Sequence, residues 1–456
     1  MTVDQRVSGP QESPAEAPRR LAATLFPEPA ATVGARRWPV RLAVLLGGGL
    51  YLAWRTPGVG AWDTVWAEDG ANFLNDAANR SVVDAITNTL NGYFGVYNRL
   101  VAEVVTSFPV SWWAVVNTLL AVASTLGLAA IVYSCAAGFL PHRALRLFVA
   151  APIVLQWVAN GEAVNNNATL QFPMLYALFW ILLAVPRTRL GRVGAPVAAG
   201  LIALTSTLAV VFIPLALLRA AVRRDRSGIA TAAALVGAMG IQLVALAAGK
   251  ADRGDIGGTR LDLTWIGRSV FERLLPQSFF GERWIAHPIT AAPDHPWLIA
   301  AALVPLLAAG VVALLRLRRP PAEGPSVPLA ALALLHAAGL YSAELIVLGR
   351  VPNRYLVAPS MLIVVAIVAL LRPRAGARLS GWAPLAVVGA LLAVTSIANY
   401  RVDHQTRTPS TPSWSAQADA ARVACRADPS AFEAILLSGP RGAPYGQVHI
   451  PCDRLR

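Results

Sequence analysis

The chain has 456 residues, of which 55% are hydrophobic and only 14% charged. A soluble protein of this length would have about a quarter of its residues charged. Apolar runs long enough to cross the hydrocarbon core of a bilayer recur along most of the length. The composition excludes a soluble protein and predicts an all-α, multi-pass membrane protein, with the lipid bilayer as its first partner.

The formal net charge is +14, but the positions of the arginines argue against a nucleic-acid partner. The arginines cluster in short turns between apolar runs, for example at 187–192, 219–226 and 372–378. Basic turns of this kind face the cytoplasm in membrane proteins. The excess of positive charge therefore reports the orientation of the chain in the membrane.

The N-terminal segment precedes the first apolar run. Residues 1–35 are rich in Pro, Ala and Glu and have no apolar period, which is typical of disorder. A signal peptide fits less well, because the apolar run starts too late. We predict a disordered cytoplasmic tail over residues 1–38.

About eleven membrane spans follow when the basic turns are placed in the cytoplasm, and together they form a transmembrane domain over residues 39–398. The predicted spans are 39–54, 111–137, 146–159, 172–186, 193–205, 207–222, 229–249, 297–315, 327–348, 355–371 and 382–398. This arrangement puts the N-terminus in the cytoplasm and the C-terminus outside the plasma membrane. Several spans are short, so they are expected to be tilted or broken.

The two sides of the membrane receive very different loops. Cytoplasmic loops are only about 6–12 residues long, too short to fold into a domain. The outer side receives the long loops 55–110 and 250–296 and the C-terminal tail 399–456, with nearly all the acids beyond the N-terminal tail. The function is therefore expected outside the membrane.

The outer tail contains two cysteines, Cys425 and Cys452. An oxidising compartment favours a disulfide between them, and two cysteines without matching histidines make a poor metal site. The stretches AFEAILLSG and YGQVHIPC indicate a small α/β appendage. We predict a structural disulfide and no metal site.

The first candidate for chemistry is the acid pair Glu68–Asp69 in the stretch VWAEDGANFL, early in the first outer loop. Either acid would be favourable as a cap of the helix expected to follow. A catalytic role is the alternative, and the pair alone does not decide between the two.

The second candidate is the outer turn GRVPNRYLVAP, residues 349–359, which contains Arg350, Asn353, Arg354 and Tyr355. Arginine is disfavoured on the outer side of a membrane. Anchoring at the interface is one explanation for these residues. Guanidinium groups at headgroup depth also suit phosphate oxygens, so the turn is a candidate phosphate site.

The third candidate is Glu344, because an acid within a span is costly and by default marks function. Pairing with Arg350, which would position that arginine, is the explanation we favour. The polar turn Asn160–Thr169, with Glu162 and Asn165–Asn167, would be able to line the same cavity. An ordinary solvated loop is the favoured interpretation of that turn.

Segment 262–275, DLTWIGRSVFERLL, is expected to form an amphipathic helix. Its apolar residues fall on one helical face and Arg273 falls elsewhere. Such a helix lies in the membrane interface or packs on the outer domain.

These features resemble the GT-C superfamily of integral membrane glycosyltransferases, which take sugars from polyprenyl-phosphate donors. The resemblance rests on a short first span, an acidic pair early in a long first outer loop, and a late Arg-Tyr-x-x-x-Pro turn, here Arg354, Tyr355 and Pro359. The stretch TVWAEDGANFLNDAANRSV is similar to the first-loop motif of actinobacterial arabinofuranosyl- and mannosyltransferases. In that superfamily the first acid, usually Asp, is the catalytic base. Glu68 stands at that position, which leaves open whether Glu68 or Asp69 acts.

The resemblance implies transfer of a sugar to a cell-envelope glycan or glycolipid. No cytoplasmic loop is long enough for a nucleotide-binding domain, so the donor would be lipid-linked. The acceptor hydroxyl needs a carboxylate base, and the departing phosphate needs cations. With no separate nucleophile, a single inverting displacement is expected. The predicted roles are base for Glu68 or Asp69, phosphate binding for Arg350, Arg354 and Tyr355, and support for Glu344 and Asn353.

The sequence does not identify a cofactor. The second acid of the pair would orient the acceptor or a divalent cation such as Mg or Mn.

The competing class is a transporter or flippase of a lipid-linked or small polar substrate. Such proteins place ionisable groups near the bilayer midplane and often have internal repeats. Glu344 fits that class, but the other charges gather on one face and no repeat is evident. A non-catalytic assembly partner is a third possibility.

Overall fold

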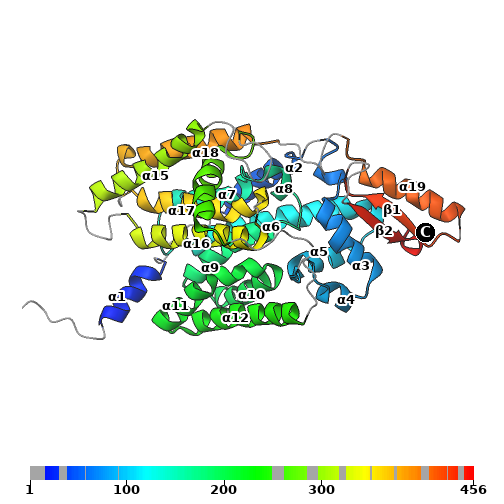
Figure 1. Ribbon diagram of the computed structural model, residues 1–456, viewed down its shortest axis with the longest axis horizontal. Helices are drawn as coiled ribbons and strands as arrows, with labels where there is room; N and C mark the ends of the chain where they lie inside the picture. The colour runs from blue at the N-terminus through cyan, green and yellow to red at the C-terminus, as the bar shows by residue number, and fades with distance from the viewer. Residues whose placement is uncertain are drawn as a thin grey trace, which may run out of the picture.

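The computed structural model describes twelve segments of the chain. They are residues 16–29, 38–56, 58–90, 92–248, 261–284, 296–317, 325–349, 352–373, 377–401, 410–428, 430–439 and 446–455. Within these segments the chain is nearly all helical, with one two-stranded sheet close to the C-terminus. Figure 1 shows a bundle of long helices, with the N-terminal helix α1 at one end and the two strands at the other. The expected all-α class is confirmed.

Eleven helices, one on each predicted span, form the bundle. They are α2 (Trp38–Ala53), α6 (Trp113–Cys135), α7 (Arg143–Leu155), α9 (Gln171–Leu183), α10 (Arg189–Thr205), α11 (Ile213–Arg223), α12 (Arg226–Ala247), α15 (Trp297–Arg316), α16 (Val327–Leu348), α17 (Val357–Leu370) and α18 (Leu379–Ala398). In the described segments, six helical stretches are long and apolar enough to cross a membrane. The chain therefore has the helices of a multi-pass membrane protein, while the count of eleven crossings and their direction stay predictions.

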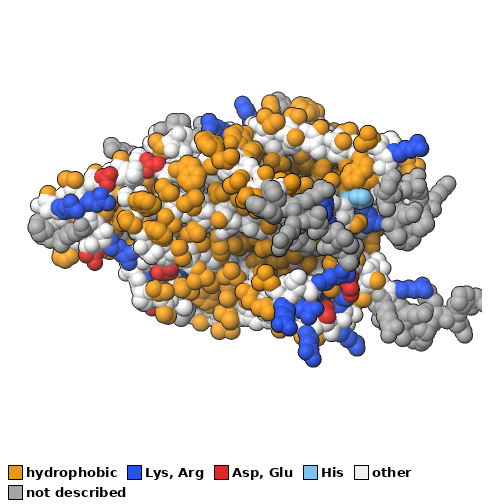
Figure 2. All heavy atoms as spheres, turned by 180° about the vertical axis from the view of Figure 1, so that it is seen from behind, with side chains coloured by type: hydrophobic (Ala, Val, Ile, Leu, Met, Phe, Trp, Pro, Cys, Tyr) orange, Lys and Arg blue, Asp and Glu red, His pale blue; other side chains and the backbone are white. Residues whose placement is uncertain are grey.

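The centre of the bundle is formed by α9 and α17. Every side chain of α9 is buried, as are residues 357–369 of α17. The peripheral helix α15 instead exposes large apolar side chains such as Val304 and Leu307, and Figure 2 shows hydrophobic side chains over much of one face. Helices apolar on all sides belong either in a core or in lipid. Buried central helices and an apolar exterior are the arrangement that a bilayer requires.

Shorter elements connect the long helices. They are η1 (Ala61–Asp63), η2 (Asp69–Leu74), α3 (Asn75–Asn79), α4 (Val82–Thr87), α5 (Val96–Thr106), η3 (Val110–Trp112), α8 (Asn160–Ala163), η4 (Thr207–Phe212), α13 (Leu263–Ser269), η5 (Val270–Leu274), α14 (Leu275–Phe280) and η7 (Asn353–Leu356). Two of them, η2 and η5, are π-helical turns. Turns of this kind are rare in proteins overall, and those that occur are often found at functional sites.

The described residues from 410 to 455 form a small α/β unit, called here the C-terminal module. It consists of α19 (Trp414–Ala427), the antiparallel strands β1 (Glu433–Leu437) and β2 (Gln447–Pro451), and η8 (Cys452–Arg454). A disulfide joins Cys425 to Cys452, as the sequence predicts. Trp414 is fully buried, stacks on Trp113 of α6 and donates a hydrogen bond to the carbonyl of Val110. The module is therefore packed on the bundle.

The prediction of a disordered tail over residues 1–38 is wrong for the described residues 16–29. Helix α1 (Glu16–Leu25) is followed by Phe26, which is fully buried. Arg223 of α11 donates to the carbonyl of Phe26 and pairs with Glu28 at 2.7 Å. A composition poor in apolar residues suggested disorder, but one aromatic side chain and one ion pair hold this segment against the bundle.

Arg55, which follows α2, joins the ends of two other helices. Its guanidinium donates to the carbonyls of Leu155 at 2.6 Å, Gln156 at 3.0 Å and Tyr400 at 3.3 Å, and lies near the rings of Tyr51 and Tyr400. Carbonyls at the C-terminal end of a helix lack intrahelical partners and carry the negative end of its dipole. A buried cation at the ends of α7 and α18 therefore stabilises both.

Replacing Arg55 by Met is expected to lower the free energy of unfolding by about 2–4 kcal/mol, because several buried carbonyls would lose their donor. Thermal unfolding in detergent would measure this. The matched control is Arg422→Gln in α19, whose partner Asp419 is exposed, and it should change stability by less than about 0.5 kcal/mol. Equal effects of the two substitutions would contradict the role given to Arg55.

Candidate active site

The first and second regions singled out in the sequence meet in the structure. Arg354 of η7 pairs with Glu68, with 3.2 Å between Nη2 and Oε1, and with Glu162, with 3.2 Å between Nη1 and Oε2. The side chain of Glu68 is 34% exposed and that of Arg354 is 25% exposed. One guanidinium thus joins the long loop after α2 to α8, at a place that solvent reaches.

Asp69, the second acid of the pair, is only 2% exposed. Its carboxylate accepts hydrogen bonds from Asn117 Nδ2 at 2.9 Å and from the backbone N–H groups of Asn167 at 3.0 Å and Ala168 at 2.7 Å. Hydrogen bonds to an ionised carboxylate are among the stronger ones in proteins. Asp69 therefore fixes η2 to α6 and to the segment before α9, and of the two acids Glu68 is the one exposed to solvent.

Glu68 lies at the N-cap position of η2, where the sequence suggested a capping role. Its side chain makes no capping hydrogen bond. The capping explanation is therefore wrong for Glu68, whose carboxylate is turned to Arg354 instead.

The polar segment Asn160–Thr169 is not the solvated loop that the sequence favoured. Asn166 and Thr169 are fully buried and Asn167 is 1% exposed. Ala159 and Asn165 adopt positive φ angles of 56° and 55°, a conformation that non-glycine residues keep only where their surroundings impose it. The prediction of an ordinary solvated loop is wrong because these amides have partners inside the protein, such as Asp69 for the N–H of Asn167.

Asn353 is the centre of a buried polar network next to Arg354. Its Oδ1 accepts from Arg273 Nη2 at 2.7 Å and from Gln277 Nε2 at 3.0 Å. Its Nδ2 donates to Glu282 Oε2 at 3.3 Å, and Oε1 of the same acid accepts from the N–H of Gly161 at 2.9 Å. The network joins η7, which carries Arg354, and α8, which carries its partner Glu162, to η5 and α14.

Arg273 was not identified as a site residue from the sequence, where it falls on the polar side of an amphipathic helix. It is only 5% exposed, and its Nε and Nη1 have no hydrogen-bond partner among the residues that the structure describes. Burial lowers its pKa, although the charges of Tyr341 and Glu162 act in the opposite direction. A buried cation with unused donors is costly unless an anion binds it. In the sequence, the one available signal for such a role was a basic residue next to the apolar face of the predicted helix.

Tyr93 is a second residue that the sequence analysis missed. Burial, followed by the negative charge of Glu68, raises the pKa of Tyr93 to about 12. Like any tyrosine hydroxyl at neutral pH, that of Tyr93 is protonated and able to donate a hydrogen bond. Nothing in the local sequence marks this tyrosine, because its proximity to Glu68 depends on the path of the loop.

The remaining predicted residues are placed as follows. Glu344 of α16 is 6% exposed and lies within electrostatic range of Arg354 and Tyr355. Tyr355 packs edge-on against Phe172, with ring centroids 4.7 Å apart. Arg350 lies outside the described residues, so the expected pair between Glu344 and Arg350 stays a prediction.

The acid pair does not fit a divalent cation. Mg and Mn require several oxygen ligands around one point. Asp69 is instead bonded to three N–H donors and Glu68 to a guanidinium. Within the described segments, no group of three or more His, Cys, Asp or Glu side chains is placed to hold a metal ion. We assign no chemical step to a metal ion.

Comparisons of the chain with protein-family models, with curated proteins and with solved structures find no match. Any functional conclusion therefore depends on the geometry of the site and on the resemblance in its motifs.

The two acids should respond differently to neutralisation. Asp69→Asn replaces an acceptor by an amide that faces N–H donors, and should lower the free energy of unfolding by about 2–4 kcal/mol. Glu68→Gln loses a partly exposed ion pair and should cost less than about 1 kcal/mol. Thermal unfolding of both variants checks this, and an equal loss in the two would contradict the different roles.

Glu282 predicts a pH dependence of stability. Burial raises its pKa to about 7, against the lowering effect of the hydrogen bonds from Gly161 and Asn353. A carboxyl group whose pKa is raised on folding stabilises the protein at low pH, and this contribution is lost as pH rises through about 7. The protein should therefore lose about 1 kcal/mol between pH 6 and pH 8.

The melting temperature of the wild type and of Glu282→Gln at these two pH values tests the assignment. The variant, which has no titrating group at this position, should show a smaller drop. The same drop in both proteins would show that another group titrates.

Proposed function

We propose that the protein is a membrane glycosyltransferase that transfers a sugar from a polyprenyl-phosphate donor to an acceptor of the cell envelope. The observation that carries the proposal is a solvent-reachable carboxylate, Glu68, held by Arg354. Close by, through Asn353, lies a buried arginine, Arg273, with unused donors. This set supplies the two groups that such a transfer needs. The motif resemblance around Glu68 and Arg354 adds independent support.

Glu68 is the proposed general base. The oxygen of the acceptor hydroxyl attacks the anomeric carbon, and the bond from that carbon to the phosphate oxygen breaks with its electron pair on phosphate. The carboxylate of Glu68 takes the proton of the hydroxyl. The ion pair with Arg354 orients this carboxylate. Because the acceptor attacks directly, the configuration at the anomeric carbon is inverted.

Arg273 is the proposed primary partner of the donor phosphate. The charge of Arg354 is already matched by Glu68 and Glu162, which leaves it less suited to bind a further anion on its own. Within the described part of the chain, two nitrogens of Arg273 have no hydrogen-bond partner. A fixed cation at the leaving phosphate stabilises the charge that develops there. Arg350 and Tyr355 complete the proposed phosphate site.

The proposed topology has the N-terminus in the cytoplasm, about eleven crossings and the C-terminal module outside. The disulfide between Cys425 and Cys452 supports this direction, since structural disulfides persist in oxidising compartments. Glu68 is on the same side as the module, because η2 contacts the residues around β2 (Gly70 lies against Ser438 and Val448). These contacts support the proposal that the reaction takes place on the outer side.

Transfer by the purified protein in lipid nanodiscs tests the proposal, with a panel of radiolabelled polyprenyl-phospho-sugars and envelope glycan acceptors. The donor can be selected from the mass spectrum of the lipid that copurifies. Glu68→Gln should lower kcat by about 10²–10⁴-fold with little change in the KM for donor. Arg273→Gln should lower kcat/KM for donor, and Arg273→Lys should recover part of the loss because it restores the charge.

Glu433→Gln, an exposed acid of β1 in the module, is the control and should transfer at the wild-type rate. Wild-type rates for Glu68→Gln would refute the assignment of the base. Movement of the labelled lipid across vesicles without a covalent product would favour a transporter, the class that a buried Glu344 also suits.

A further inference from the structure

The C-terminal module contacts the segment that carries Glu68 on both sides of that residue. Ser438, at the end of β1, is 1% exposed and its Oγ donates to the carbonyl of Ala67 at 3.3 Å. Before Glu68, Asp63 accepts from the N–H of Ser415 at 2.8 Å and from the hydroxyl of Ser413. The start of α19 and the end of β1 are thus bonded to the residues that precede Glu68.

Gly70 shows how closely the module approaches. A Cβ at Gly70 would lie 2.6 Å from Ser438 Cβ, 2.7 Å from its Oγ and 3.0 Å from Val448 Cγ2. Real Cβ atoms essentially never have neighbours closer than 3.0 Å. Glycine is therefore required here by the module, because in a helical conformation alanine would otherwise be the better residue.

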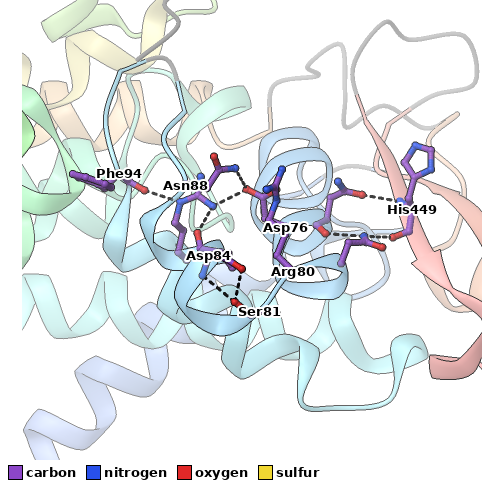
Figure 3. Close-up of polar contacts among 11 residues, drawn as sticks. Asp76, Arg80, Ser81, Asp84, Asn88, Phe94 and His449 are labelled. Carbon is purple, nitrogen blue, oxygen red and sulfur yellow. Dashed lines mark hydrogen bonds and ion pairs between the residues drawn. The ribbon is translucent and has the colours of Figure 1, made fainter. Parts of the chain in front are cut away.

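Beyond Glu68, helix α3 is held between the module and α5. Asn75 Oδ1 accepts from the N–H of His449, and Asn79 Nδ2 donates to the carbonyl of His449, at 2.9 and 2.8 Å. On the other side, Asp76 accepts from Arg99 of α5 at 2.7 Å. Figure 3 shows His449 of β2 facing α3, with Asp76 directed away from the strand. The chain is therefore held on both sides of the π-helical turn η2, by the module before the turn and by the contacts of α3 after it.

We propose that the C-terminal module positions Glu68. Ser438 fixes the position of the π-helical turn η2 relative to the module through its contacts with Ala67 and Gly70. The role of Glu68 in this inference rests on the proposed function. The contacts between the module and the turn are independent of that function. The disulfide closes α19 onto the end of β2, so it keeps the bonded parts of the module together. Ser438 and the disulfide are positioning elements, since neither contacts the reacting atoms.

A pair of reciprocal substitutions tests the contact. Gly70→Ala should force Ser438 away and lower kcat by at least about tenfold, with the KM for donor nearly unchanged, because displacement of a catalytic group by about 1 Å is costly. Ser438→Gly loses the bond to Ala67 but introduces no collision, so it should lower kcat measurably, though by less than Gly70→Ala does. The double variant should transfer at close to the rate of Ser438→Gly, because the collision with Ser438 is removed and only the contact with Val448 at 3.0 Å remains.

The matched control is Gly127→Ala in α6, where a Cβ would meet nothing within 4 Å, and it should keep the wild-type rate. A double variant as impaired as Gly70→Ala, or a Gly70→Ala that acts only through the KM for donor, would overturn the proposal.

Hydrogen–deuterium exchange gives a readout that needs no activity. In the Cys425→Ser/Cys452→Ser variant, amides of residues 63–79 should exchange faster, while those of the central helix α17 should not change. Unchanged exchange over 63–79 would overturn the proposal even in an active enzyme. If the wild type transfers no sugar, the proposed function fails, and faster exchange would still establish that the module holds the turn.

Discussion

The site depends on the burial of one carboxylate. Asp69 is bonded to three N–H donors from α6 and from the segment before α9, and this satisfies a charge that would otherwise be very costly in the interior. With Asp69 fixed inward, the preceding residue is directed to the surface, where Glu68 meets Arg354. The same guanidinium also pairs with Glu162. The segments that carry Glu68, Glu162 and Arg354 are thus held together, because Asp69 is buried while its neighbour Glu68 is exposed.

Much of the fold follows from properties that local sequence carries. A helix that crosses lipid must be apolar over a fixed length, so eleven apolar runs predicted the positions of eleven helices. Cys425 and Cys452 are the two cysteines of the tail that the sequence predicts on the outer side, and their pairing was predicted from the oxidising compartment expected there. Pairing of Glu68 with Arg354 was not predictable in detail, but both residues were candidates because charge is rare in such a chain.

The parts that sequence could not predict are those in which a polar group finds its partner far along the chain. Helical periodicity assigned Arg273 to a polar face, yet the π-helical turn η5 places it in the interior, where Asn353 binds it. Arg55 is likewise buried, but carbonyls at helix ends use its donors. Phe26 shows the same limit for apolar contacts, because one side chain anchors a segment whose average composition predicts disorder.

The contacts between the C-terminal module and the segment after α2 have a consequence for biosynthesis. Residues 63–79 leave the ribosome long before the strands that flank Gly70 and bind α3 are made. During that interval the Glu68 turn lacks the partners that define its shape, whatever the state of the helices already inserted. Completion of the proposed catalytic site is thus a late event in maturation, and a nascent chain would lack the final shape of that site until β2 is in place.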